Sequence, residues 1–319
     1  MQQLVSILIP VHNAAQSISA TIQSCLNQTY PHIEIVILDD ASDDSSLNVI
    51  QSFDSLKITV IQNNIRQGIA VSRNTLLDHA RGAYIAWLDA DDTMQEERID
   101  SQVAFMQTHP GIDIAGSWIY TDYPDLPAKK LPLLHHHIKT ILWFKNCMIQ
   151  PSIISKNFYK KEQIWYDTSF DQAAEDYELW LRLINKKTFA NIPLFLSTYH
   201  LTAGIELEKK QEQNKFKKQW GKLWDIKWKQ IHVSVSSNDQ LFFQDFIYKN
   251  RMLTTEEGNS IHKTLLLLRQ NNTDSFFRLV IAFHQLRLWK NMGLGQKITH
   301  IYLLKNLVFY FRMKRNYLF

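Results

Sequence analysis

The first 118 residues alternate between short apolar, β-rich runs and longer segments with helical spacing. The runs that predict strands are Val5–Pro10, Ile33–Leu38, Ile58–Gln62, Ala83–Leu88 and Ile112–Gly116. The segments that predict helices lie between them: Ala15–Asn27, Ser45–Phe53, Ile69–Ala80 and Glu96–Thr108. Strands that are apolar along their whole length are expected when helices cover both faces of a parallel sheet. The pattern therefore favours an α/β domain with a Rossmann-like, mostly parallel sheet.

Polar residues follow these strands at the points where a sheet of this kind binds its ligands. Asn13 follows the first strand, Asp39-Asp40 follows the second, and Asp89-Ala90-Asp91-Asp92 follows the fourth. Ligands of open α/β sheets bind outside the carboxyl ends of the strands. We therefore expect an acid-rich site at this edge of the sheet.

The Asp89-Ala90-Asp91-Asp92 cluster is the sharpest of these features. Two like charges about 4 Å apart repel by about 4 kcal/mol at an effective dielectric of about 20, so clustered carboxylates need protons or a cation. Oxygen ligands of this kind suit Mg²⁺ or Mn²⁺. The structural alternative is a solvated turn in which Asp92 or Thr93 caps the following helix.

Two further acidic pairs have both a structural and a functional interpretation. Asp39 and Asp40 suit a turn that caps the next helix, and equally a site where a carboxylate binds a base or ribose group of a nucleotide. Glu175 and Asp176 precede the helical segment 177–183, where acids are favoured by the helix dipole. The same place suits a carboxylate base aimed at a cleft by a rigid helix, and the spacing leaves both interpretations open.

The charge of the chain is divided unevenly along its length. Residues 1–205 hold 15 Lys and Arg against 22 Asp and Glu, whereas residues 206–319 hold 20 against 9. Beyond Ile205 the strand signal also fades, and nearly all of the remaining sequence has a helical pattern. We therefore predict an α/β domain over residues 1–205 and a basic, all-α domain over residues 206–319.

The basic C-terminal domain has two interpretations. Trp220, Trp224 and Trp228 share one helical face with lysines nearby, and residues 301–319 mix aromatic and basic side chains. An apolar stripe of this kind suits a core, and equally a surface that rests on anionic lipid. No helix-turn-helix, RNP or zinc signature accompanies the charge, so we expect no nucleic-acid partner.

Sequence features favour a reducing, cytoplasmic compartment. The two cysteines, Cys25 and Cys147, cannot form a disulfide framework. The N-terminal residues lack the basic region of a signal peptide, and no apolar run approaches the roughly 18–20 residues that span a bilayer. We expect a cytoplasmic protein, with peripheral contact at the inner face of the cytoplasmic membrane as an alternative. The sequence carries no feature that predicts an oligomeric state.

Five segments, in order, resemble the family 2 glycosyltransferases, whose catalytic domain has the GT-A fold. They are residues 5–13 (VSILIPVHN), 35–44 (IVILDDASDD), 68–74 (GIAVSRN), 82–92 (GAYIAWLDADD) and 174–183 (AEDYELWLRL). The resemblance covers roughly residues 3–205. Gly116-Ser117-Trp118 and Gln150-Pro151-Ser152 make the chain most similar to bacterial hexosyl- and N-acetylhexosaminyltransferases of lipopolysaccharide or capsule synthesis.

The resemblance implies a role for each matching residue. Asp91 and Asp89 would bind Mn²⁺ or Mg²⁺, with Asp91 the direct ligand. Asp176 would be the catalytic base, and Glu175 would lie beside the acceptor. Asp40, in preference to Asp39, would contact the uracil ring. The whole nucleotide-sugar site would comprise Pro10, Val11, Asn13, Asp39, Asp40, Gly68, Arg73, Asn74, Asp89 and Asp92.

The implied function is an inverting, metal-dependent transfer of a hexose or N-acetylhexosamine from a UDP-sugar to a cell-surface glycan. A lipid-linked glycan would be the acceptor. Asp176 would remove the proton of the acceptor hydroxyl as it attacks the face opposite the leaving UDP. The rival interpretation is a non-catalytic protein with a GT-A-like domain, which binds a nucleotide-sugar or scaffolds a membrane assembly and has no need of Asp176.

One segment departs from the family pattern. Family members often carry Tyr-Arg-x-His after the helix that bears the base, where a loop closes over the diphosphate. Here the corresponding residues are Tyr199-His200-Leu201-Thr202. The imidazole is displaced, which leaves open whether His200 contacts metal or phosphate.

Overall fold

A computed structural model of the chain describes residues 2–122, 128–170, 173–200, 219, 221–230, 235–248, 253–274, 277–278, 280–281 and 284. The chain forms two compact units. The first comprises residues 1–138 and 146–219, and the second comprises residues 139–145 and 220–319. The boundary expected near residue 205 falls in residues 201–218, which lie outside the described residues, and it stays a prediction.

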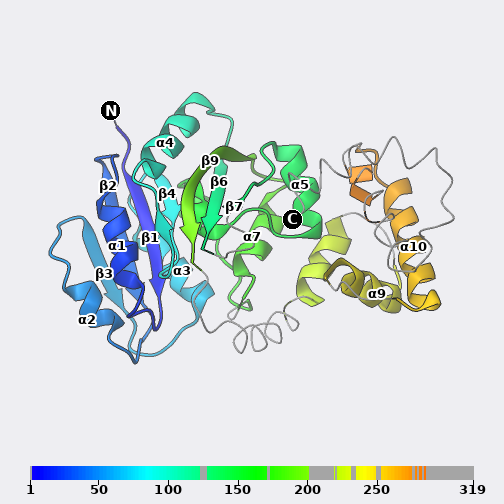
Figure 1. Cartoon of the computed structure of the whole chain (residues 1–319), viewed down its shortest axis with the longest axis horizontal. Coiled ribbons are helices and arrows are strands. Elements are labelled where there is room, and N and C mark those ends of the chain that lie inside the picture. Colours follow the sequence, from blue (N-terminus) through cyan, green and yellow to red (C-terminus); the bar gives the residue numbers. More distant parts are fainter. Residues whose placement is uncertain are drawn as a thin grey trace. The chain divides into compact units, whose positions relative to one another are not determined.

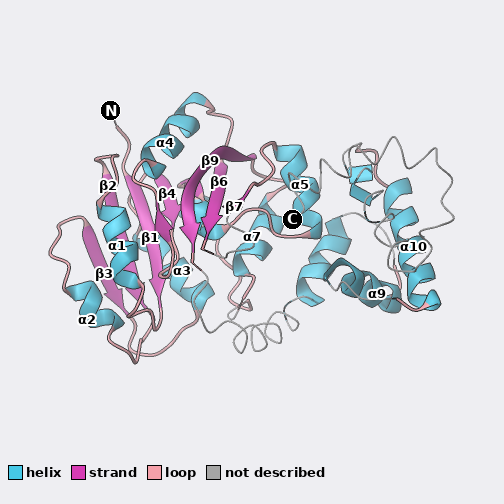
Figure 2. Ribbon diagram, in the orientation of Figure 1, coloured by secondary structure: helices cyan, strands magenta, loops and turns pink. Residues whose placement is uncertain are grey.

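The first unit is built around a nine-stranded sheet in the order β3-β2-β1-β4-β8-β6-β9-β5, with β7 paired to β6 (Figures 1 and 2). β1 pairs in parallel with β2 and β4, and β2 in parallel with β3, whereas β8 runs antiparallel to β4 and β6. The predicted α/β fold is therefore confirmed, as a mixed sheet whose N-terminal half is parallel. The strands are β1 (Val5–Val11), β2 (Ile33–Asp39), β3 (Ile58–Gln62), β4 (Tyr84–Trp87), β5 (Thr93–Met94), β6 (Ile114–Thr121), β7 (Ala128–Lys129), β8 (Ile154–Lys156) and β9 (Phe189–Tyr199).

The helices of this unit follow the strands closely, as the sequence pattern predicts. α1 begins three residues later than expected because the backbone N–H groups of Ala14 and Ala15 donate to Ser46 Oγ and Asp44 Oδ2, which hold this segment as a loop. The helices are α1 (Ile18–Leu26), α2 (Ser46–Gln51), α3 (Ile69–His79), α4 (Arg98–Thr108), α6 (Tyr159–Glu162), α7 (Glu175–Leu183) and the 3₁₀ helix η1 (Gln150–Ser152). A further helix, α5 (His135–Phe144), begins in this unit, and its residues 139–144 belong to the second unit.

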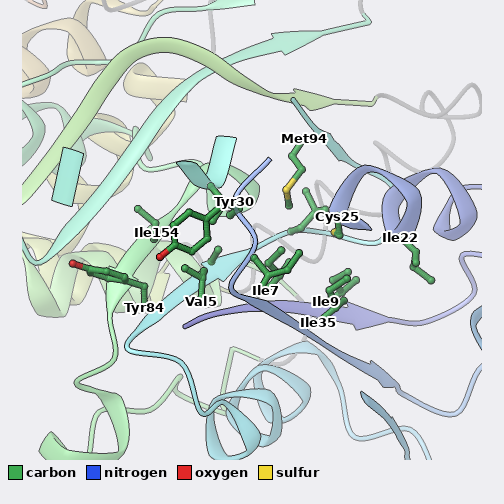
Figure 3. Packing of buried hydrophobic residues seen from close by; sticks show 14 of the residues in the cluster. Val5, Ile7, Ile9, Ile22, Cys25, Tyr30, Ile35, Tyr84, Met94 and Ile154 are labelled. Atoms are coloured by element: carbon green, nitrogen blue, oxygen red, sulfur yellow. The ribbon is translucent and has the colours of Figure 1, made fainter. Parts of the chain in front are cut away.

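The buried core fixes the positions of β1 and β2, and with them the edge of the sheet at which both strands end. Ile7, Ile9 and Ile35 project from β1 and β2 toward Ile22 and Cys25 of α1, and all five are fully buried (Figure 3). Burying one such isoleucine contributes about 1.5–3 kcal/mol relative to leaving it exposed. A one-residue slip of either strand would move these side chains to the opposite face of the sheet, away from α1. The apolar pattern therefore holds the loops after β1 and β2 at one edge.

Apart from β6, which overlaps the predicted strand Ile112–Gly116, the second half of the sheet was not predicted from the sequence. β9 contains Pro193 and is displaced in register against β6, where Ser117 pairs with Ile192 but Trp118 pairs with Phe195. The two extra residues of β9 form an irregularity that accommodates the proline, which cannot donate to a ladder. The missed strands β5 and β8 are only two and three residues long. Their pairing depends on contacts between distant segments, which periodicity does not report.

The second unit has an aromatic core. Trp224 and Trp228, in the helical residues 221–230, are buried and pack edge-on to Trp143, with centroid separations of 5.4 Å each. Phe243 of α9 (Ser237–Tyr248) packs on both tryptophans. The core interpretation therefore holds for Trp224 and Trp228. Trp220 and residues 301–319, the other parts of the expected lipid-facing surface, lie outside the described residues.

A long helix completes the described part of this unit. α10 (Thr255–Gln270) begins with a capping box, in which the Thr254 hydroxyl accepts from the backbone N–H of Glu257 and the Glu257 carboxylate accepts from the N–H of Thr254. Such caps contribute about 1 kcal/mol. Across the described residues, none of the helices is both long enough and apolar enough to cross a membrane.

Candidate functional site

A cleft of about 1270 Å³ opens in the first unit, at the carboxyl ends of β1, β2 and β4. One part of its wall comes from the strand ends, the loops that follow them and the start of α3, and we call it the N-terminal lining. It comprises residues 10–17, Asp40, Asp44, residues 66–69, Ser72, Arg73 and residues 89–91. Its C-terminal lining is Ile119, Lys129, residues 149–151, residues 173–176 and Tyr199.

Most of the residues singled out from the sequence meet in this cleft. Asp39, Asn74 and Asp92 are not part of its lining. Those that line it are Pro10, Val11, Asn13, Asp40, Gly68, Arg73, Asp89, Asp91, Glu175 and Asp176. The fold thus joins segments more than 160 residues apart at one site, and the role of each residue there stays a prediction.

Asp40 organises the loop that leads into α3. One carboxylate oxygen accepts hydrogen bonds from Asn63 Nδ2 at 2.7 Å and from the Gln67 N–H at 2.9 Å, and the other accepts from the Gly68 N–H at 2.8 Å. Gly68 has a φ of 89° at the N-cap of α3, a conformation that favours glycine. Asp40 therefore holds the cleft-lining residues 66–69 in place. Its predicted contact with uracil stays a prediction.

Asp39 and Asn74 make structural contacts beside the cleft. Asp39 is buried and accepts from both the N–H and the hydroxyl of Ser42, which closes the turn after β2. The Asn74 side chain donates to the carbonyl of Tyr166 at 3.0 Å and accepts from its N–H at 2.8 Å. The contacts of Asp39 match its structural interpretation as a turn residue, and the implied role of Asp39 and Asn74 in the nucleotide-sugar site stays a prediction.

Arg73 joins the two ends of the motif series. Its guanidinium pairs with Asp89 at 2.9 Å and with Glu175 at 3.0 Å, although the two acids are far apart in sequence. The guanidinium is nearly fully buried and lies over the rings of Trp87 and Tyr166. Charges buried in this way require paired partners. The three charged side chains therefore form one unit that aligns the loop after β4 with the start of α7.

Asp176 lies beside this unit. Its carboxylate accepts a hydrogen bond from Asn146 Nδ2 at 2.9 Å, and from the N–H of Tyr177. Burial, together with the neighbouring negative charge of Glu175, raises the pKa of Asp176 to about 7, and the positive charge of Arg73 opposes the rise. A carboxylate with a pKa near neutral is suited to general base catalysis.

Asp91 and Asp92 occupy different environments. Asp91 lines the cleft, whereas Asp92 is fully buried and accepts from the backbone N–H of His200 at 2.9 Å. Burial and the charges of Asp89 and Asp91 raise the pKa of Asp92 to about 9. The other oxygen of Asp92 has no hydrogen-bond partner among the described residues. The raised pKa of Asp92 agrees with the expectation that carboxylates so close together need a proton or a cation.

The donor atoms of the cluster fit a hard divalent cation. Asp89 and Asp91 both present carboxylates to the cleft, and Mg²⁺ is usually bound through one or two carboxylates together with substrate phosphates. Within the described residues, no three acidic, His or Cys side chains come together as a complete metal cage. A cation held by this chain would therefore share its coordination with a bound ligand.

His200 is occupied away from the cleft. Its ring lies between the Thr93 hydroxyl, 3.1 Å from Nε2, and the Asp122 carboxylate, 3.2 Å from Nδ1, while its backbone N–H donates to Asp92. Its neighbour Tyr199 lines the cleft in its place. These contacts tie His200, which directly follows β9, to Thr93, Asp122 and Asp92.

Several residues of the site were missed by sequence reasoning, among them Asn146, Lys129 and Tyr199. Asn146 and Lys129 lie in the irregular stretch between the motifs, where no periodicity or spacing distinguishes them. Tyr199 belongs to a segment that was inspected only for its histidine. Lys129 and Tyr199 reach the site through β7 and β9, and Asn146 through its hydrogen bond to Asp176, so each depends on long-range contacts.

Solved structures share this arrangement of the chain. TarS of S. aureus, in complex with UDP, superposes with a TM-score of 0.60 at 16% identity, covering 93% of this chain and 93% of that one. A mannosyltransferase from Pyrobaculum calidifontis, in complex with GDP-Man and Mn²⁺, gives a TM-score of 0.51 at 15% identity, covering 99% and 81%. At such identities the likeness concerns the fold alone, and it confirms the GT-A fold.

Sequence comparison goes further. Residues 6–166, about half of the chain, match the family model Glycosyl transferase family 2. Escherichia coli WfaP, a UDP-Glc:alpha-D-GlcNAc-diphosphoundecaprenol beta-1,3-glucosyltransferase, is 33% identical over 199 residues, which cover 62% of this chain and 77% of WfaP. WfgD, an E. coli enzyme described by the same activity, is 30% identical over 227 residues, covering 70% and 86%. The family resemblance is thus confirmed, and the chain belongs to glycosyl transferase family 2 as a glycosyltransferase.

Proposed function

We propose that this glycosyltransferase inverts configuration as it moves a hexose or N-acetylhexosamine from a UDP-sugar to a lipid-linked glycan of a cell-surface polysaccharide. The observation that carries the proposal is the Arg73 unit. Arg73 pairs with Asp89 on the donor side and with Glu175 next to Asp176, so acids suited to both substrates face one cleft.

Asp176 is the proposed catalytic base. The acceptor hydroxyl attacks the anomeric carbon, its proton passes to Asp176, and the bond between that carbon and the diphosphate oxygen breaks with its electron pair on the oxygen. Asn146 and the Tyr177 N–H orient the carboxylate by hydrogen bonds. Its pKa of about 7 leaves a large ionised fraction at neutral pH while keeping it basic enough to accept a proton. A single displacement of this kind inverts configuration.

Donor binding is assigned to the N-terminal lining. Asp40 fixes residues 66–69, whose backbone faces the cleft beside Pro10 and Asn13, where a nucleoside would lie. Asp91 and Asp89 would hold Mn²⁺ or Mg²⁺, which supplies charge neutralisation at the diphosphate when bound. The presence of UDP in the TarS structure and of Mn²⁺ in the mannosyltransferase supports both assignments.

The acceptor is inferred from the relatives. WfaP and WfgD are named for transfer to a sugar on diphosphoundecaprenol, and we propose an acceptor of the same class. Such a lipid holds the reaction at a membrane surface, which fits the excess of basic residues in positions 206–319. We propose that this charge gives the enzyme a peripheral position on the inner, cytoplasmic face.

The decisive test of the reaction is a screen of UDP- and GDP-sugars with Mn²⁺ or Mg²⁺ and a polyprenyl-diphosphate sugar. We expect acceptor-dependent release of UDP and a product of inverted anomeric configuration by NMR. Release of GDP in place of UDP, or retained configuration, would contradict the corresponding part of the proposal. Binding of a UDP-sugar with no release under any of these conditions would favour the rival, non-catalytic interpretation.

The membrane proposal is tested with substitutions that remove charge and not with a deletion. Deleting the C-terminal residues would remove Phe243, which packs on Trp143, and would expose that ring. Replacing Lys305, Arg312, Lys314 and Arg315 by glutamine removes four charges from the end of the chain. We expect weaker sedimentation with vesicles containing anionic lipid and no change with neutral vesicles. Equal binding of the parent and the variant to anionic vesicles would refute a role for these residues.

A further inference from the structure

Lys129 places a positive charge in the acid-rich cleft. It is the second residue of β7, where it pairs with Ile119 of β6, and both residues belong to the C-terminal lining. β7 lies beside β6 in Figure 1, and β6 also pairs with β9. The Lys129 side chain is half-buried, and burial lowers the pKa of its ammonium group, while the negative charge of Asp92 opposes the decrease. The group is therefore partly removed from water.

The ammonium group of Lys129 has no protein acceptor among the described residues. Its contact is with the ring of Tyr199, at 5.5 Å from the centroid, and no hydrogen bond or ion pair accompanies it. Arg73, the buried cation of the same cleft, has two carboxylate partners. A lysine carries three donors, and placing it partly out of water without acceptors is unfavourable. Among the described residues, the ammonium group of Lys129 therefore has an aromatic contact but no hydrogen-bond acceptor.

We propose that Lys129 binds a phosphate group of a substrate diphosphate in the cleft. This inference rests on the proposed function and deepens it. It names a residue that would contact either the leaving diphosphate of the donor or the diphosphate that links the acceptor sugar to its lipid. Two sources share this chemistry: the diphosphate of the nucleotide-sugar and the diphosphate of the lipid-linked acceptor. At the donor, the lysine N–H groups would donate to the oxygen that receives the electron pair when the bond to the anomeric carbon breaks. No proton needs to be transferred from Lys129.

The adjacent residue provides a matched control. Lys130 is exposed, lies over the ring of Trp118 at 5.1 Å, and is not part of the cleft lining. Lys129→Met and Lys130→Met remove the same charge one residue apart. Any effect of net charge or of long-range attraction is therefore common to both variants, whereas a direct contact is lost in only one. Lys129→Arg restores a cation, and Lys129→Gln is a second variant should the methionine impair folding.

The experiment measures binding of UDP and of uridine by calorimetry, with Mn²⁺ present throughout, and the KM of a polyprenyl-diphosphate sugar. For a donor contact, Lys129→Met should weaken UDP binding by about ten-fold or more and leave uridine binding unchanged. For an acceptor contact, the acceptor KM should rise by a similar factor with UDP binding intact. Lys130→Met should match the parent, and Lys129→Arg should recover most of the loss.

The outcomes separate this inference from the proposed function. If the parent binds and releases UDP, and Lys129→Met retains both UDP affinity and acceptor KM, Lys129 has no phosphate contact and only this inference fails. Equal losses for UDP and uridine, or equal losses in Lys130→Met, would also overturn it, since they indicate a structural or long-range effect. If the parent neither binds UDP nor acts on a UDP-sugar, the proposed function fails and this inference fails with it.

Discussion

The two linings of the cleft are built by different means. The N-terminal lining follows from consecutive strand–helix units, in which each polar residue stands at the end of an apolar strand. The C-terminal lining is assembled from β6, β7, η1, α7 and β9, whose pairing is long-range and includes a register shift at Pro193. The first lining is a regular product of local pattern, and the second depends on the whole unit being folded.

This difference coincides with a division of labour. In the proposed reaction, the regular lining binds the donor, which has a nucleotide common to many enzymes, and the irregular lining presents the base and the acceptor. Arg73 is the link between them, since it pairs with Asp89 in one and Glu175 in the other. Four substitutions test whether the two linings are separable in this way.

The largest effect is expected from Asp176→Asn, in the C-terminal lining. Removing a positioned base typically costs about 10²–10⁴-fold in rate, so kcat should fall by that factor while the affinity for UDP stays the same. A parallel loss of UDP affinity would show that the linings are not separable.

The same variant should remain folded. Because folding raises the pKa of Asp176 above its unfolded value, its contribution to stability is present at acid pH and is lost as pH rises from about 4 to about 7. Asparagine has no charge to bury, but its amide sets a donor against one of the N–H groups of Asn146 and Tyr177, so Asp176→Asn should unfold at a temperature close to that of the parent at pH 8, by calorimetry. A much lower Tm there would point to loss of structure.

Arg73→Met should affect both linings at once. It leaves Asp89 and Glu175 without their partner, and breaking a buried ion pair from one side costs about 3–5 kcal/mol in the free energy of unfolding. We expect a large fall in Tm together with weaker UDP binding and slower transfer. Lys160→Met is the control, because Lys160 and its partner Asp78 are both largely exposed, and it should cost about 0–1 kcal/mol.

Asp40→Asn should act on the N-terminal lining alone. An amide in place of the carboxylate sets a donor against one of the N–H groups of Gln67 and Gly68, at a cost of about 1–3 kcal/mol in stability. Disordering of residues 66–69 should raise the KM for the UDP-sugar and leave the acceptor KM unchanged, in initial-rate measurements with each substrate varied. A change confined to the acceptor KM would reverse the assignment of the linings.

The smallest effect is expected from Asn146→Leu, which removes a hydrogen bond to the proposed base Asp176 and leaves the N-terminal lining unchanged. The proposed reaction needs ionised Asp176, so kcat/KM should rise with pH through about 7 in the parent. Asn146 donates to the carboxylate and favours its ionised form, and losing this bond should move the rise to higher pH. If kcat/KM falls at every pH while the midpoint of its pH dependence stays the same, Asn146 has a structural role alone.

Most of the fold and part of the site could be predicted from the sequence, for a local reason. In β1, β2 and β4 every residue is buried, so an apolar run identifies each strand and its end identifies the cleft. Asp40, Asp89 and Asp91 were found in this way, and Asp176 through the family motif around it. The strands β5 and β8 are too short for any period to appear, and β9 is interrupted by Pro193.

The sequence by itself thus determined the parallel half of the sheet and the acids at the strand ends, because these depend on burial patterns within short segments. It indicated the family through the resemblance of five motif segments. Only the tertiary structure decided which ion-pair and hydrogen-bond partners those acids have. It pairs Arg73 with Asp89 and Glu175, sets Asn146 on Asp176, and leaves Lys129 in the cleft without an acceptor among the described residues. Pairing of charges and the pKa values that follow depend on distances between segments far apart in the chain, and these distances exist only once the sheet has formed.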